Sequence, residues 1–179
     1  MNRQQTEKNH ENNVAASLPP GRGVGTMAVL VVLHLAVVLP LAYILNIWMD
    51  EASTLYTTEK GFLQTWRNVF ADEKQAPLYF LLLSLWRAVS GGIFWARLFS
   101  VLCSALAIKF FVDLARRFFN ENEARFVSAL FALNPFLIWS SVEIRGYSLT
   151  ILLSVLLLKF FAEAFLDSGK SEVERQIKQ

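Results

Sequence analysis

The hydrophobic pattern divides the chain into long apolar runs separated by polar breaks. The longest run, residues 24–48, contains no Asp, Glu, Lys or Arg and exceeds the ~20 apolar residues that a helix needs to cross a bilayer. It is also longer than the ~7–15 residues of a signal-peptide core, so we expect an uncleaved anchor. Three further runs, roughly 97–116, 125–143 and 146–167, have comparable lengths. The pattern predicts an all-α, polytopic membrane protein with about four transmembrane helices.

A fifth apolar stretch, residues 76–89, is too short to be a comparable span. It offers only ten residues from Pro77 to Trp86 before Arg87, and ten helical residues rise ~15 Å, about half of a hydrocarbon core. Proline is favoured at the first position of a helix. We therefore predict a juxtamembrane helix that begins at Pro77 and lies in the membrane interface.

The region between the first two spans, residues 49–96, is predicted to be a structured external loop. Gly61 separates two short helical patterns, and Asp50 is a candidate N-cap for the first of them. The second pattern repeats apolar residues at helical spacing, as in an amphipathic helix that lies on a bilayer. These residues are Phe62, Leu63, Trp66, Val69 and Phe70.

The distribution of positive charge predicts the orientation. Residues 1–23 are polar and read as a disordered tail, residues 24–167 form the transmembrane module, and residues 168–179 are a charged tail. Four spans place both tails on the same side as the loop between the second and third spans, which satisfies the positive-inside rule. We therefore expect a multi-pass plasma (inner) membrane protein with both termini cytoplasmic and residues 49–96 extracytoplasmic. The basic residues of that loop are Arg116, Arg117 and Arg125.

Composition supports the membrane interpretation and narrows the function. The 179 residues are 54% hydrophobic and only 18% charged, with a mean hydropathy of +0.38. The net charge of +2 and the lack of a long basic tract argue against a nucleic-acid partner. The single cysteine, Cys103, excludes a disulfide framework. His34, in the middle of the first run, is interpreted as a helix-packing polar residue, with a proton relay as the alternative.

Two carboxylates stand at the exit of the first span, in the stretch WMDEAS. Asp50 and Glu51 have no basic neighbour in sequence before Lys60. They are either a cap at the membrane boundary or part of an active site. No His, Cys or carboxylate cluster has the spacing of a metal site, but a divalent ion shared by this pair with distant residues is left open.

The order of the motifs resembles a known family. The Asp-Glu pair is followed by APLYF, FWARLFSVLCSALAIKFFVDLARRFF, ALFALNPFLIWSS and EIRGYSL. Over about residues 27–167 this order resembles the N-terminal module of GT-C superfamily membrane glycosyltransferases. The nearest match is glycosyltransferase family 39, which includes protein O-mannosyltransferases and bacterial lipid A aminoarabinose transferases. Within it, the chain looks most like the RgtA/B/C/D-like branch.

The resemblance implies a hexosyl- or pentosyltransferase-type enzyme that moves a sugar from a polyprenyl-phosphate carrier to an extracytoplasmic acceptor. Asp50 matches the acidic residue that serves as the catalytic base or stands beside it, and Glu51 completes the pair. Burial near the apolar boundary would raise the pKa of such a carboxylate and make it a better base. Donor-phosphate or substrate binding is carried over to the matching Arg145, Tyr147, Arg97 and Tyr79.

Several alternatives stay open. The two arginines also suit anchors for lipid headgroups, and the two tyrosines suit an aromatic belt. Glu143 either pairs with Arg145 or faces the site. Because such enzymes are several times longer, we expect a truncated enzyme, a split enzyme completed by a second polypeptide, or an inactive remnant. The alternative function is a non-catalytic membrane assembly or lipid-headgroup-binding protein.

Overall fold

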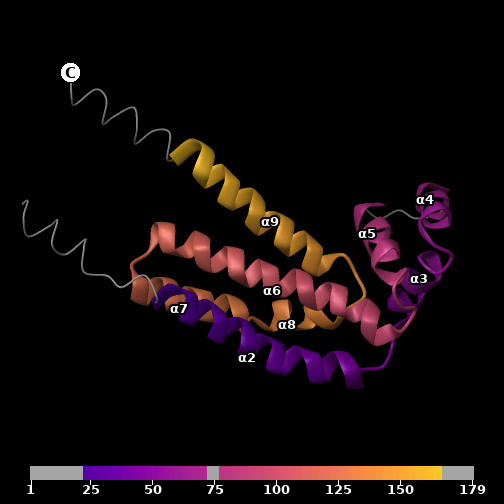
Figure 1. Cartoon of the computed structure of the whole chain (residues 1–179), viewed down its shortest axis with the longest axis horizontal. Coiled ribbons are helices and arrows are strands. Elements are labelled where there is room, and N and C mark those ends of the chain that lie inside the picture. The colour runs from indigo at the N-terminus through magenta and orange to yellow at the C-terminus, as the bar shows by residue number, and fades with distance from the viewer. Residues whose placement is uncertain (1–21, 72–76, 167–179) are drawn as a thin grey trace, which may run out of the picture.

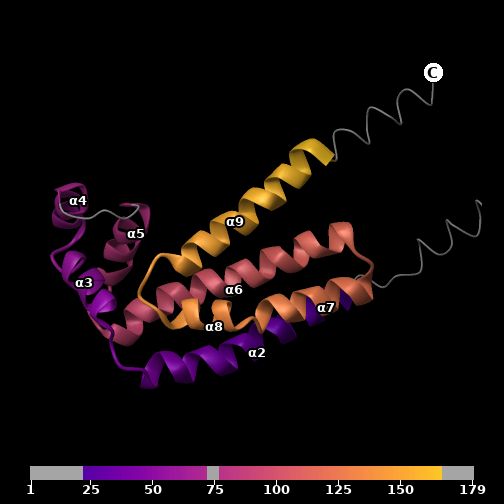
Figure 2. The same cartoon turned by 180° about the vertical axis from the view of Figure 1, so that it is seen from behind.

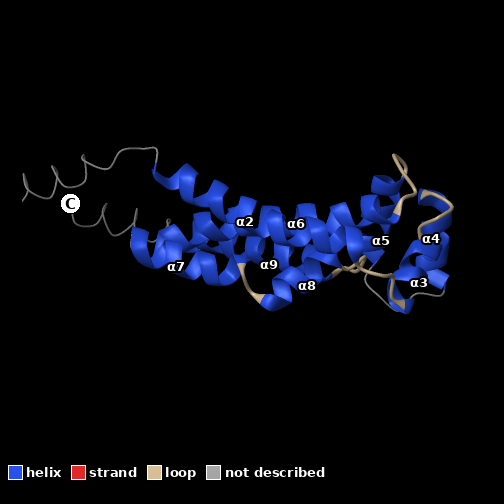
Figure 3. Cartoon of the chain, turned by 90° about the horizontal axis from the view of Figure 1, so that it is seen from below, coloured by secondary structure: helices blue, strands red, loops and turns tan. Residues whose placement is uncertain are grey.

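The computed structural model describes residues 22–71 and 77–166, and every regular element in these two ranges is helical (Figures 1 and 3). The predicted tails, residues 1–23 and 168–179, lie outside the described residues, except that residues 22–23 begin the first helix. The eight helices confirm the all-α fold class. They are α2 (Arg22–Ile44), α3 (Met49–Thr57), α4 (Phe62–Ala71), α5 (Pro77–Arg87), α6 (Ile93–Phe118), α7 (Glu121–Ala132), α8 (Pro135–Val142) and α9 (Tyr147–Phe161), which ends in a π-helical turn (Ala162–Leu166).

Three helices are long and apolar enough to cross a membrane. They cover Gly25–Ile44, Ile93–Phe118 and Tyr147–Phe165. Large apolar side chains on α2 and α9 are exposed, including Val32 and Leu157, as a lipid environment requires. The long apolar helices identify the chain as a membrane protein with three to four candidate spans.

The fourth candidate span is a pair of shorter helices. α7 and α8 are bent by 47° at a short break, and together they are long and apolar enough to cross a membrane. Both pack against α6 and α2, and in Figures 1 and 2 they follow each other along α6, so that α8 ends near α3. A re-entrant loop would return to the side where it began. The arrangement therefore supports a single broken crossing, as the run 125–143 predicts.

The break between α7 and α8 is stabilised by side chains. Pro135 has no N–H to donate, and the Phe136 N–H donates to Asn134 Oδ1 (2.8 Å), which caps α8. In a continuous helix that N–H would donate to the Ala132 carbonyl. The Ala132 oxygen instead lies 2.9 Å from His34 Nδ1. His34 thus satisfies a carbonyl that the bend leaves without its helical partner.

His34 also connects two other helices. Its Nε2 lies 3.0 Å from Ser104 Oγ on α6 and 3.2 Å from Ser141 Oγ on α8, and the residue is fully buried. Three contacts with three helices fit the helix-packing role expected from the sequence. α6, which packs against α2, α5, α7, α8 and α9, is the centre of the bundle.

Helices α3, α4 and α5 gather at one end of the bundle, beyond the end of α2 and the start of α6 (Figures 1 and 2). Gly61 separates α3 from α4 with a φ of 81°, a conformation that glycine adopts without strain. α5 begins at Pro77 as predicted. On α4, Val69 is buried, whereas Leu63 and Trp66 are exposed, so most of the apolar face predicted for this helix is not covered by the rest of the described chain. Whether α4 and α5 touch lipid stays a prediction.

Two tryptophans join α5 to α6. The rings of Trp86 and Trp95 are stacked with centroids 4.7 Å apart. Each indole N–H donates to the backbone carbonyl of the other residue, at 2.8 and 2.9 Å. This reciprocal contact closes the short connection between the helices and fixes α5 beside the start of α6. It thereby positions Tyr79, on α5, next to the candidate site.

Candidate functional site

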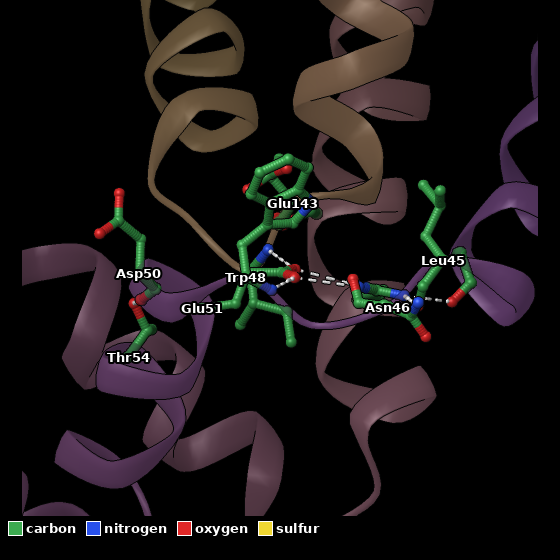
Figure 4. A network of polar contacts seen from close by, with 11 residues as sticks. Leu45, Asn46, Trp48, Asp50, Glu51, Thr54 and Glu143 are labelled. Atoms are coloured by element: carbon green, nitrogen blue, oxygen red, sulfur yellow. Dashed lines mark hydrogen bonds and ion pairs between the residues drawn. The ribbon is translucent and has the colours of Figure 1, made fainter.

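The adjacent carboxylates Asp50 and Glu51 point in different directions (Figure 4). Neighbouring residues on an α-helix are about 100° apart around its axis. The Asp50 side chain is 74% exposed, whereas that of Glu51 is fully buried. Asp50 is not the N-cap that the sequence suggested, because α3 begins at Met49 and Trp48 occupies the cap. The Trp48 N–H donates to Glu51 Oε2 at 3.2 Å, so the Glu51 side chain, in the first turn of α3, caps the start of the helix.

Glu51 forms a buried ion pair with Arg97 of α6. Its Oε2 lies 2.9 Å from Arg97 Nη2, and its Oε1 accepts from Arg97 Nε at 3.4 Å. The Ile144 N–H, in the connection between α8 and α9, also donates to Oε1 at 2.8 Å. Both carboxylate oxygens are therefore occupied. Glu51 joins α3, α6 and the α8–α9 connection.

The Arg97 guanidinium likewise uses all of its hydrogen-bond donors. Its guanidinium carries five N–H groups, and besides the two bonds to Glu51 it donates to three backbone carbonyls at the end of α2. The last carbonyls of a helix lack partners within the helix, and a cation is favourable there. The bonds are 3.0 Å to Ala42, 2.7 Å to Leu45 and 3.0 Å to Asn46. In this conformation every Arg97 N–H is engaged, so phosphate binding would have to displace an existing bond.

Asp50 pairs with Arg145 instead. Arg145 lies in the connection between α8 and α9, and its Nη1 is 2.7 Å from Asp50 Oδ2. The Arg145 side chain is 15% exposed, and its guanidinium carbon lies 5.8 Å from the centre of the Tyr147 ring. Among the described residues, Asp50 is its only ion-pair partner. The structure thus brings together three residues that the resemblance selected.

Arg145 lies at the edge of a cleft between α5 and α9. The cleft has a volume of about 230 Å³, and its walls are mostly apolar. Charge is therefore concentrated at one place in an otherwise hydrophobic groove. The lining residues are Leu78, Tyr79, Phe80, Arg145, Gly146, Tyr147, Leu149, Thr150 and Leu153.

Tyr79 forms the inner wall of the cleft. It is 6% exposed, and a Cβ placed on Gly146 would meet its Cβ and Cγ at 3.5 Å. Its hydroxyl is close to Ser100 but has no hydrogen-bond partner among the described residues. Burial raises the pKa of this hydroxyl, partly opposed by Ser100. Tyr79 therefore stays neutral and presents an unsatisfied donor and acceptor beside the cleft.

Glu143 is a third carboxyl at this site, and the family resemblance did not select it. It ends α8 and is 9% exposed. Ser100 Oγ donates to its backbone carbonyl at 2.7 Å. Burial raises the pKa of its side chain, and the nearby Glu51 carboxylate raises it further. Of the two alternatives considered from sequence, pairing with Arg145 is wrong: among the described residues, Arg145 pairs with Asp50 and Glu143 forms no ion pair.

The six sequence-predicted residues fall into two groups. Glu51 and Arg97 form a buried structural pair, while Arg145, Tyr147 and Tyr79 line the cleft and Asp50 pairs with Arg145. Within residues 22–71 and 77–166, no group of three or more His, Cys, Asp or Glu side chains is placed to hold a metal ion.

A comparison with protein-family models, curated proteins and solved structures finds no match to this chain. The family resemblance therefore rests on the motifs of the sequence alone.

Proposed function

We propose that this chain is the catalytic module, or part of it, of a membrane glycosyltransferase that uses a polyprenyl-phosphate sugar donor and an extracytoplasmic acceptor. One observation carries the proposal. An exposed carboxylate, Asp50, and a guanidinium, Arg145, lie 2.7 Å apart at the charged end of an apolar cleft. The cleft matches a ligand with a hydrocarbon chain and an anionic headgroup. Following the charge distribution, we assign this end to the extracytoplasmic face.

The proposed chemistry assigns one role to each group. The prenyl chain lies against Leu149 and Leu153, and the donor phosphate meets the N–H groups of Arg145 that Asp50 leaves available. The acceptor hydroxyl oxygen bonds to C1 of the sugar while the bond from C1 to the phosphate oxygen breaks. The electron pair leaves with the phosphate, where the Arg145 charge stabilises it. The proton of the acceptor hydroxyl passes to Asp50 as general base.

In this proposal Glu51 and Arg97 are positioning residues. Their oxygens and N–H groups are taken up by the contacts that join α2, α3, α6 and the α8–α9 connection. These contacts hold the first turn of α3 beside Arg145. The proposal thus gives Glu51 and Arg97 a role in fixing Asp50, in place of the catalytic and phosphate-binding roles that the family resemblance implies.

A second candidate is binding of a lipid headgroup without transfer. The Asp50–Arg145 pair presents one negative and one positive group at the same cleft, which also complements a zwitterionic headgroup. The two candidates differ in whether Asp50 is required for chemistry or only for binding.

The test is Asp50→Asn in membranes from a host that also expresses the neighbouring reading frames, which supplies any second polypeptide. We expect sugar transfer from polyprenyl-phosphate donors to fall by ~10²–10⁴-fold, with insertion and donor binding retained. Glu59→Gln, at an exposed carboxylate just after α3, removes the same charge and should leave transfer unchanged. Sugar transfer at the wild-type rate in Asp50→Asn would refute the assignment of Asp50 as the general base. Donor binding without any wild-type transfer would favour headgroup binding.

A further inference from the structure

The Glu143 side chain occupies an unusual place in the charge arrangement. The Glu143 backbone carbonyl accepts a hydrogen bond from Ser100. The N–H of the following residue, Ile144, donates to Glu51, and the Arg145 side chain after it is paired with Asp50. The backbone of residues 143–145 is therefore fixed between the two ion pairs. Glu143 itself is buried, at 9% exposure.

The charges around Glu143 come from several elements. α3 contributes Asp50 and Glu51, α6 contributes Arg97, and the α8–α9 connection contributes Arg145. These two carboxylates and two guanidinium groups are present as ion pairs and balance each other. An ionised Glu143 therefore adds one uncompensated negative charge next to Arg145. The elements that pack against α8 or border the site carry further titratable side chains, among them His34, Tyr43, Tyr56, Tyr79, Cys103, Lys109, Asp113, Arg125, Tyr147 and Lys159.

Burial and the Glu51 charge already favour the protonated form, because they raise the pKa of Glu143 above its ordinary value of 4.5. Arg97 and Arg145 oppose this shift without reversing it. A ligand phosphate on Arg145 would add a further negative charge and weaken the opposing effect of that guanidinium. Like charges close together at low dielectric favour protonation of one of them.

We propose that Glu143, two residues before Arg145 in the α8–α9 connection, is a proton-binding residue beside the cleft, whose carboxyl takes up a proton when an anionic lipid phosphate binds at Arg145. This inference rests on the proposed function. It makes Glu143 a determinant of affinity for anionic ligands, which the ionised carboxylate repels and the neutral carboxyl accepts.

The sign of the linkage follows directly. The bound state has the higher Glu143 pKa, so it carries more protons than the free state between the two pKa values. Affinity for the anion is then highest below the pKa of the free protein and falls as pH rises toward that of the complex. A difference of one pKa unit between the two states corresponds to a tenfold change in Kd.

The experiment measures Kd from pH 5 to pH 8 for the full-length chain in uncharged detergent. The probe is methyl farnesyl phosphate, a prenyl phosphodiester whose single charge is constant over this range. We expect the wild-type Kd to rise about tenfold across the range. Glu143→Gln should bind with a Kd that changes less than about threefold and stays near the acid value of the wild type. Calorimetry in two buffers of different ionisation enthalpy should show proton uptake by the wild type only.

Two controls keep the result interpretable. Glu143→Asp retains a titrating carboxyl and should keep a pH dependence, while Glu59→Gln, with the same loss of charge outside the cleft, should reproduce the wild-type slope. A wild-type Kd that is independent of pH, or an unchanged slope in Glu143→Gln, would overturn the proton linkage and leave the proposed function standing. Absence of wild-type binding at every pH would overturn both.

Discussion

At the scale of single residues, Asp50 and Glu51 differ in what surrounds them. Glu51 is enclosed by donors from Trp48, Arg97 and Ile144, whereas Asp50 is exposed and meets only one guanidinium. The Glu51 oxygens are both engaged within the protein, whereas the Asp50 carboxylate is accessible from outside. This difference is the basis on which we propose Asp50 as the general base.

The buried pair gives a stability prediction for Arg97→Lys. Lysine keeps the charge but has three N–H donors instead of five, so at least two of the acceptors around Arg97 lose their partner. Each buried unsatisfied acceptor costs about 1–3 kcal/mol. We expect the midpoint of thermal denaturation in detergent to fall clearly. Size-exclusion chromatography of heated samples measures this midpoint. Arg67→Lys, on the exposed face of α4, should leave the midpoint in place, and an equal midpoint for Arg97→Lys would contradict the network.

The sequence motifs pointed to these residues but did not show which of them pair with each other. The order of motifs selected Asp50, Glu51, Arg97 and Arg145, yet nothing in the pattern shows which carboxylate meets which arginine. Adjacent helical residues do not share a face, so the split of Asp50 from Glu51 was available as a signal. The partner choice depends on the end of α2 meeting the start of α6, which is a property of the tertiary packing. The position of Glu143 depends on the same packing.

At the scale of elements, the sequence predicted helix boundaries correctly where a single residue has a direct steric effect on the backbone. Gly61 and Pro77 marked the boundaries of α4 and α5 correctly, because positive φ favours glycine and the first helical position favours proline. The run 125–143 was read as continuous, and the structure divides it at 133–134. Asn134-Pro135 is a recognisable helix-start signal, but the carbonyl partner of the bend, His34, lies far away in sequence.

The orientation that we infer from the charge distribution predicts the accessibility of the two ends of the bundle. On a Cys103→Ser background, Tyr56→Cys and Glu121→Cys should be probed with an impermeant thiol reagent in intact cells. Both positions are exposed, whereas the neighbouring Thr57 is buried and would report poorly. We expect labelling at position 56 and protection at position 121 until the membrane is permeabilised. The reverse pattern would contradict the assigned orientation, and labelling at both positions in intact cells would contradict a crossing between them.

At the scale of the whole molecule, the candidate site lies where the helical bundle meets α3 and α5. α3 and α6 carry the buried Glu51–Arg97 pair, the α8–α9 connection carries Arg145, and α5 and α9 form the cleft walls. The site is therefore assembled from segments distributed over nearly the whole described chain. Its charged end adjoins α3 through the Asp50–Arg145 pair, and one of its apolar walls is α9, a candidate membrane span.

Photo-crosslinking tests this account most directly. A polyprenyl phosphate with a diazirine on its first isoprene unit is incubated with the full-length chain in membranes, irradiated, and the adducts are located by mass spectrometry. We predict adducts in residues 78–80 and 145–153, the two segments that line the cleft, and a severalfold loss of these adducts in Arg145→Ala but not in Arg67→Ala. Adducts spread evenly over the exposed faces of α2 and α9, with the same yield in wild type and Arg145→Ala, would contradict a lipid-phosphate site at Arg145.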